Sequence, residues 1–298
     1  MYKLLCIFTG AALAFMMTFN GELSAAYGTF GSTVIIHIVG TVFAFLICLI
    51  KREKIRLRTS APLWAYLGGT VGVFQVLCNA LCYGHIAVSS ITALALLGKM
   101  LSSLIFDRFG LMGLKKQSIG IDTWISFFFG LIGMYIMIDS TGNAALFAIF
   151  IAVGVGVLNV LARTINARLS QETGPLCGSF INHLTGLPLS VILFLILGSG
   201  MTGNTMLPAF DPSKLWMYLG GTIGVLTVLL GNITVPKVDA FNITVLSFVG
   251  QSFTSMLIDI ILGNTGSSTS FAGGVVICFG ILLGMLAKHY IHNKKSRI

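Results

Sequence analysis

The chain has 298 residues, of which 56 % are hydrophobic and only 9 % are charged, and its mean hydropathy is +0.95. A soluble domain carries roughly 25 % charged residues, so this composition excludes a protein surrounded by water. The apolar stretches are continuous rather than alternating, which is typical of membrane helices and not of a membrane β-barrel. We therefore expect an all-α integral membrane protein in contact with the lipid bilayer.

The predicted membrane helices follow from the length of the apolar stretches. A bilayer-spanning helix needs about 20 mostly apolar residues. The first stretch also resembles a signal peptide, but it is repeated in mid-chain, so we expect it to be retained as a membrane helix. Ten helices are predicted, near residues 4–21, 32–50, 64–83, 87–106, 119–139, 144–163, 178–198, 215–234, 241–262 and 271–291.

The chain has a net charge of +9, and the placement of its basic residues indicates how the chain is oriented in the membrane. If the N-terminus is cytoplasmic, every Lys and Arg except Lys99 and Lys214 falls on the cytoplasmic side. The positive-inside rule then predicts a multi-pass protein of the bacterial cytoplasmic (inner) membrane with both termini in the cytoplasm. These basic loops therefore indicate orientation, and no nucleic-acid partner is expected.

An internal repeat organises the chain. WAYLGGTVGV at 64–73 returns as WMYLGGTIGV at 216–225, identical at eight of ten positions and offset by 152 residues. Earlier in each unit the offset is 146, as in Asn20/Asn166 and His37/His183. Each unit holds five predicted helices, and an odd number inserts the second unit upside down. We predict two five-helix inverted-topology repeats, at 1–142 and 143–298, an architecture typical of transporters.

Polar side chains inside the predicted helices indicate a cavity, because polar groups in hydrocarbon are costly unless they face a partner or water. They concentrate in the first, third, fourth, sixth, eighth and ninth helices, so the fifth and tenth are expected to lie outside the cavity. The candidate substrate-binding residues are Lys99, Gln251, Asn20, Glu22, Gln75, Asn79, Asn159, Asn166, Asn232, Ser103 and Ser255.

Lys99 is the most informative of these residues. It lies about 12 residues into its helix, and at ~1.5 Å per residue this is about 18 Å from the outer end. Two interpretations remain open: the side chain extends to the cytoplasmic interface, or its amine lies in the cavity, where it binds an anionic group or repels cations. Its repeat counterpart is the uncharged Gln251, so the cavity is expected to be electrostatically asymmetric.

Glu22 has three interpretations: a gate residue opposite its repeat counterpart Arg168, a carboxylate that couples transport to protons or cations, or a solvated loop residue. His37 and His183 are expected to hydrogen-bond in helix packing. Asp107 ends its helix, where a carboxylate opposes the macrodipole, and Arg108 is its candidate partner.

The six cysteines lie in or beside apolar helices without a framework spacing. Cys78 and Cys82 share a helix face, but no His, Asp or Glu accompanies them there. They are expected to be small packing residues. The sequence predicts no metal site and no cofactor.

These motifs resemble the drug/metabolite transporter superfamily, and within it the YdcZ-like family. The resemblance rests on N-x-x-L-S-x-x-x-G…H-x-x-G at 20–40 and again at 166–186, on W-x-Y-L-G-G-T-x-G, and on G-Q-x-x-x-S-x-x-x-D at 250–259. It implies a fused ten-helix chain of EamA-like fold, a central cavity, and export or exchange of small organic molecules. Two departures stand out: Lys99 replaces a Gln, and 11–14 lacks the mid-helix Glu of the small members.

We therefore expect a secondary active transporter that moves a small polar or amphipathic metabolite or drug by alternating access, with proton coupling or exchange as possible modes. A channel or a structural membrane subunit is the alternative. No Walker loop, H-E-x-x-H or G-x-S-x-G motif occurs, so neither ATP-driven pumping by this chain nor a membrane enzyme is favoured. The expected partner is a small-molecule substrate, and the expected oligomeric state is a monomer or homodimer.

Overall fold

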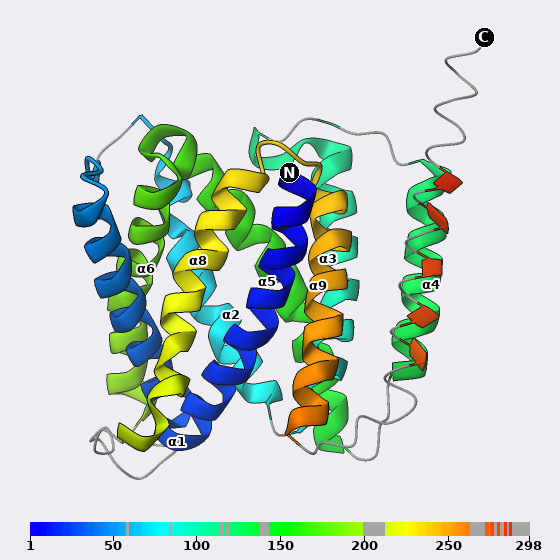
Figure 1. Cartoon of the computed structure of the whole chain (residues 1–298), viewed down its shortest axis with the longest axis horizontal. Helices are drawn as coiled ribbons and strands as arrows, with labels where there is room; N and C mark the ends of the chain where they lie inside the picture. Colours follow the sequence, from blue (N-terminus) through cyan, green and yellow to red (C-terminus); the bar gives the residue numbers. More distant parts are fainter. Residues whose placement is uncertain are drawn as a thin grey trace.

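The computed structural model describes residues 1–57, 60–83, 85–86, 88–113, 116, 120–137, 143–198 and 212–262. It also describes the short stretches 272–273, 275–276, 279–280, 283–284 and 286–287. The described elements form a bundle of helices, drawn in Figure 1. Helices suit this composition because hydrocarbon offers the backbone no hydrogen-bond partners, so each segment must satisfy its own amide and carbonyl groups.

Six described helical segments are long and apolar enough to cross a membrane. Short helical turns at Leu63–Leu67, Phe194–Gly198 and Pro212–Tyr218 extend three of the longer helices. The α-helices are α1 (Tyr2–Ile50), α2 (Gly68–Cys82), α3 (Val88–Phe109), α4 (Ile121–Met137), α5 (Asn143–Thr173), α6 (Pro175–Leu193), α8 (Leu219–Thr234) and α9 (Ala240–Ile261).

The connection predicted between the first two helices is itself helical. α1 runs through it and departs from helical geometry only at Gly28, with φ 72° and ψ 161°. The equivalent glycine, Gly174, has φ 86° and ψ 154° and separates α5 from α6. Side chains with a Cβ rarely adopt such angles, so glycine at both positions permits the same reversal of direction.

The predicted count of ten helices is not established by the eight described α-helices. α1 accounts for two predicted helices. The tenth, at 271–291, lies largely outside the described residues, although the short stretches described within it are helical. The count of ten therefore stays a prediction.

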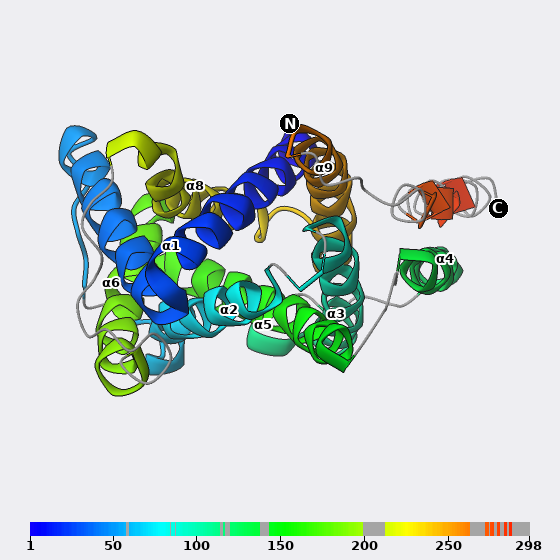
Figure 2. The same cartoon turned by 90° about the horizontal axis from the view of Figure 1, so that it is seen from below.

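The helix contacts come in equivalent pairs. α1 packs against α8 and α9, and α5 packs in the same way against α2 and α3. α6 completes the arrangement by contacting both α1 and α2. Viewed along the helices in Figure 2, α4 stands outside this bundle on the side of α3, as expected for the predicted fifth helix. Its Phe129 ring packs against Phe279, with ring centroids 5.8 Å apart.

Glycines bring the paired helices into backbone contact. A Cβ added at Gly98 would overlap the carbonyl oxygen of Val153 in α5, and one added at Gly250 would overlap that of Ile7 in α1. Ile7 and Val153 are 146 residues apart, while Gly98 and Gly250 are 152 apart, so one contact is repeated at equivalent positions. Small residues permit this approach in membrane helices, where dispersion contacts replace the hydrophobic effect.

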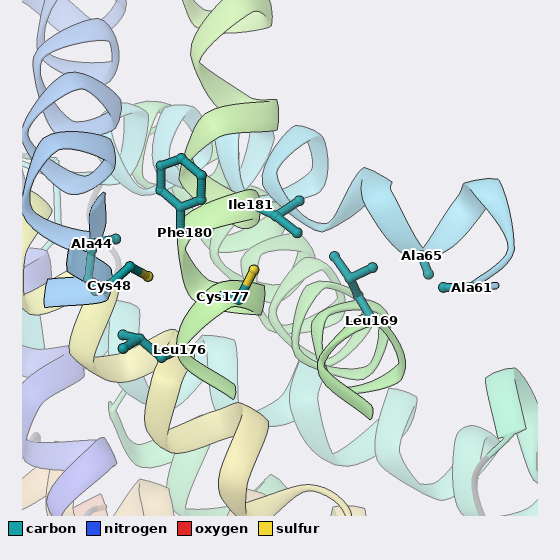
Figure 3. Close-up of a cluster of buried hydrophobic side chains, with 10 residues drawn as sticks. Ala44, Cys48, Ala61, Ala65, Leu169, Leu176, Cys177, Phe180 and Ile181 are labelled. Atoms are coloured by element: carbon teal, nitrogen blue, oxygen red, sulfur yellow. The ribbon is translucent and has the colours of Figure 1, made fainter. Parts of the chain in front are cut away.

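A buried apolar cluster joins the helix ends on the side of the bundle where the chain begins. Figure 3 shows Phe180 and Ile181 of α6 between Cys48 at the end of α1 and Leu169 of α5. Leu169 and Ile181 are almost fully buried, with 1 % and 2 % exposure. The cluster fixes α6 against both α1 and α5, which positions the cavity-facing residues of α6.

Candidate functional site

A cavity of about 1030 Å³, including its open part, lies between the helices of the bundle. Its wall is formed by residues from α1, α2, α3, α5, α6, α8 and α9, so both halves of the chain contribute. The described residues of α4 do not line it. A mostly apolar wall with a few polar groups that point into the cavity is typical of sites for small organic molecules.

Most of the predicted site residues lie along this cavity or beside it. Asn79 lines an adjoining pocket of about 330 Å³, and Gln251 lines another of about 320 Å³ that it shares with Lys99. The predicted residues that line the main cavity itself are Asn20, Gln75, Lys99, Asn159, Asn166 and Asn232.

Lys99 faces the cavity and not the membrane interface. Its Nζ donates a hydrogen bond of 2.9 Å to Oε1 of Gln251, the residue 152 positions later. The Lys99 side chain is only 4 % exposed. Of the two interpretations of Lys99, the structure therefore favours the cavity position, with the two equivalent residues in direct contact where α3 meets α9.

Two predicted serines lie in the contact between α3 and α9 and not along the cavity. Ser103 is 2.8 Å from Oγ1 of Thr244, and Ser255 is 3.1 Å from Oγ1 of Thr92. Thr92 is equivalent to Thr244, so the two hydrogen bonds are one contact repeated at equivalent positions. Both serines are fully buried, so they hold the two helices together on either side of the Lys99–Gln251 pair.

Arg163 is a cavity residue that the sequence analysis assigned to the cytoplasmic side. It lines the cavity wall, and its Nη2 donates to Oγ of Ser103 (3.0 Å), the carbonyl oxygen of Ala240 (2.9 Å) and Oγ1 of Thr244 (2.8 Å). The signal for this position was its spacing of four residues from Asn159 and three from Asn166, which places all three side chains on one helix face.

His37 and His183 are a second pair that the predicted site omitted. Their rings lie 5.5 Å apart, and both line the cavity. Neither ring nitrogen of either residue has a hydrogen-bond partner among the described residues, so the predicted packing hydrogen bonds are not observed. A Cβ added at Gly40 would overlap the His183 ring, and one at Gly186 would overlap the His37 ring. Glycine on each facing helix therefore makes room for the rings.

Glu22 lies outside the cavity, and its carboxylate has a hydrogen-bond partner. Its Oε1 accepts a hydrogen bond of 2.8 Å from the hydroxyl of Tyr83, which follows α2. The Tyr83 ring lies directly over Gly21, where a Cβ would overlap it. A hydrogen bond between Tyr27 and Tyr218 joins the same part of α1, just before the bend at Gly28, to the segment before α8. Together these contacts close the end of the bundle that is distant from the N-terminus.

The cavity reaches toward the opposite end of the bundle. Its wall extends to Cys6 in the second turn of α1, to Val235 after α8 and to Ile243 in the first turn of α9. These three positions lie at the end where the chain begins, the upper end in Figure 1. The cavity is therefore lopsided: it extends toward the N-terminal end and stops short of the Glu22–Tyr83 contact.

Asp107 has a different partner from the expected Arg108. Its Oδ2 accepts a hydrogen bond of 3.1 Å from the backbone amide of Phe241, near the start of α9. The carboxylate that opposes the dipole of its own helix is thus stabilised by the positive end of another. Of the cysteines, Cys82 donates to the carbonyl oxygen of Ala148 in helix packing. The described residues contain no cluster of metal-binding side chains.

The fold and the cavity define a polytopic helical membrane protein with a central cavity. Among families of known proteins, the one described as "Putative inner membrane exporter, YdcZ" matches residues 1–136 and 147–286. This match covers both repeat units and most of the chain, so the protein belongs to the YdcZ family of the drug/metabolite transporters. It is accordingly a multi-pass inner-membrane protein of a transporter family.

A solved crystal structure of a protein without a stated function has a similar fold. It is 15 % identical in sequence, its TM-score is 0.67, and the match covers 97 % of this chain and 97 % of the other. At that identity the likeness concerns the fold alone. No curated protein matches the chain.

Proposed function

We propose that this protein is a secondary active transporter that moves a small polar or amphipathic metabolite or drug across the inner membrane by alternating access. The observation that carries the proposal is the cavity, which both halves of the chain line and which reaches the first turn of α9 at one end but not the Glu22–Tyr83 contact at the other. A carrier exposes its site to one side at a time, and a lopsided cavity is what one such state requires.

The proposed architecture is ten membrane helices in two inverted five-helix repeats, 1–142 and 143–298. The paired contacts support it, because Gly98 meets α5 as Gly250 meets α1. The two bends at Gly28 and Gly174 support it as well. In an inverted repeat, the two halves can exchange conformations, which turns a state open at one end into a state open at the other.

The direction of opening follows from the proposed orientation. With both termini in the cytoplasm, the end of the bundle that holds the start of α1 is cytoplasmic, so the described state opens inward. Glu22 and Tyr83 then belong to the outer gate, as does the contact between the Phe19 and Trp216 rings, whose centroids are 5.5 Å apart. Outward opening requires these contacts to break.

A cavity-filling substitution tests the proposed site. Gly72 lines the cavity and has open space where a side chain would begin, so Gly72→Trp is expected to fill the site without disturbing packing. Gly154 also has open space but is not among the cavity-lining residues, so Gly154→Trp is the matched control. Purified protein in liposomes preloaded with unlabelled compound would be assayed for transient uptake of the labelled compound.

Counterflow that saturates in the wild type and in Gly154→Trp, but falls at least about tenfold in Gly72→Trp, is the expected result, because a filled site excludes the solute. Flux that rises without saturation would instead identify a channel. Equal counterflow in both tryptophan variants would show that the solute does not pass through this cavity.

A further inference from the structure

The charge of the cavity is one-sided. Lys99 and Arg163 both line it, and none of the described residues that line it is an Asp or Glu. The face of α1 that borders the cavity carries Thr9, Leu13 and Met16. The only carboxylate in this part of α1, Glu22, is instead bonded to Tyr83 outside the cavity.

Neither cation forms a close ion pair in the part of the chain that the structure describes, although the Asp107 carboxylate lies near enough to attract Arg163. The ion pair found there joins Arg168 to Glu172 on the surface of α5. Asp107 and Arg163 both bond to the start of α9. The Oδ2 of Asp107 accepts a hydrogen bond from the amide of Phe241, and Asp107 does not line the cavity. Charged groups within a membrane normally pair with one another or with backbone carbonyls, and they often mark the path of a substrate or an ion. Arg163 has such a carbonyl partner in Ala240, whereas Lys99 has only the side chain of Gln251.

Both cations are positioned by neutral acceptors that leave donors available. Lys99 makes one hydrogen bond, to Gln251, out of the three donors of an ammonium group. The three hydrogen bonds of Arg163 all come from Nη2, which leaves Nη1 and Nε without a partner among the described residues. Guanidinium groups cannot lose their proton in proteins, so Arg163 contributes a fixed positive charge.

Besides the His37–His183 pair and several hydroxyl groups, the remainder of the wall is apolar and amide-rich. Leu13, Val76 and Ile243 line it, together with several asparagines. Such a wall accommodates a hydrocarbon body and hydrogen-bonds a polar head without adding charge. The cavity therefore combines apolar surface with two cationic groups.

We infer that the substrate is a small organic anion, with its carboxylate or phosphate between Lys99 and Arg163 and its apolar part against the aliphatic wall. The inference rests on the proposed transport function and deepens it by stating the charge of the solute. An anion supplies a counter-charge inside the cavity, where the wall has none, and its attraction to Lys99 and Arg163 is strong in a site of low dielectric constant. An organic cation entering the same site would meet two like charges and no carboxylate.

The first test compares isosteric ligands of different charge on the purified full chain. Phenylacetate, phenylacetamide and phenethylamine form one series, and glutarate, glutaramide and 1,5-diaminopentane form a second. Binding to the folded state alone raises the melting temperature by about 5 °C at a hundred times the dissociation constant. We expect at least one acid to stabilise the protein more than its amide and its amine. An amide or amine that stabilises as well as the acid would overturn the inference, and so would no shift with either acid.

Variants of Lys99 assign the charge to the site. Lys99→Gln is expected to weaken acid binding at least about tenfold, whereas Lys99→Arg keeps the charge and is expected to retain the preference for acids. Lys237→Gln removes the same charge from an exposed loop and serves as the control, with wild-type binding expected. Acid binding that is equal in Lys99→Gln and in the control would remove Lys99 from the site.

Counterflow of the stabilising compound separates the two proposals. An acid that binds but shows no saturable exchange would contradict the transport function and leave the anion site standing. An amine that exchanges saturably would contradict the anion site and leave the transport function standing. Saturable exchange of the acid supports both.

Discussion

The two ends of the bundle occupy equivalent sequence positions but are held by different contacts. At the end distant from the N-terminus, Tyr83 donates to Glu22 across two helices. At the other end, the equivalent positions hold Val235 and Arg168. Valine offers no donor, and Arg168 instead forms an ion pair with Glu172 one turn along its own helix, at 3.3 Å. The cavity extends toward this second end.

This difference shows how a duplicated framework acquires a direction. The glycine contacts that set where helices meet are repeated in both units, whereas the side chains that tie helices together at each end are not. The same holds at the centre, where the equivalent residues Lys99 and Gln251 differ in charge. The backbone contacts define a symmetric frame, whereas single side chains differ between the two ends and at the centre.

The largest expected effect tests whether the frame is equivalent in both halves. Gly98→Ala and Gly250→Ala each place a Cβ against a backbone carbonyl oxygen, which cannot move aside as a side chain can. We expect each to lower stability by about 3 kcal/mol, the upper part of the range for overpacking. Thermal unfolding in detergent measures it.

Gly154→Ala is the matched control, since it meets open space and relieves the helix of a glycine. It is expected to be neutral or slightly stabilising. A large loss in Gly98→Ala beside a small loss in Gly250→Ala would show that only one half depends on close approach.

The second prediction concerns the closed end. Tyr83→Phe keeps the ring over Gly21 but removes the hydrogen bond to Glu22. A hydrogen bond to a charged group contributes about 1.5 kcal/mol, so the population open at this end is expected to rise roughly tenfold. Spin labels at the exposed positions Ala25 and His85 would report it as a longer distance.

Tyr135→Phe is the control for this substitution, because Tyr135 lies on α4 and is 79 % exposed. An unchanged distance distribution in Tyr83→Phe would show that the Glu22–Tyr83 contact does not hold the end closed.

The third prediction separates the two partners considered for Asp107. Asp107→Ala removes the acceptor for the Phe241 amide at the start of α9, and loss of such a cap costs about 1 kcal/mol. Arg108→Ala is expected to leave stability unchanged, because Arg108 is exposed. Chemical or thermal unfolding of the two variants decides between them, and the reverse order would restore Arg108 as the partner.

The smallest effect is expected at the end toward which the cavity extends. Glu172→Gln removes the ion pair with Arg168. The side chain of Arg168 is 29 % exposed and that of Glu172 is 33 % exposed. Exposed pairs within one helix contribute only about 0.3–0.5 kcal/mol. Stability should therefore change little, and so should access to this end, measured by alkylation of a cysteine introduced at Val228 in the cavity wall. A marked change in access would make Arg168 a gate residue, like Glu22.

The sequence alone identified the membrane class, the duplicated unit, the YdcZ family and six of the polar residues that line the cavity. Long apolar segments admit helices only, because the backbone has no partners in lipid. Asparagines and Lys99 stood out because buried polar groups are costly there. Repetition of the same residues at fixed offsets then paired positions such as Lys99 and Gln251 before any contact was known.

Only the tertiary structure decided which polar residues meet one another and which face the cavity. Ser103 and Ser255 match the pattern of site residues, but their hydroxyl groups form hydrogen bonds between α3 and α9. Arg163 matches the pattern of a cytoplasmic charge but lines the cavity. The physical reason is that an unpaired polar side chain is energetically costly in hydrocarbon, so the sequence shows which residues need a partner. Which partner each residue finds depends on how the helices cross, and the sequence does not show that.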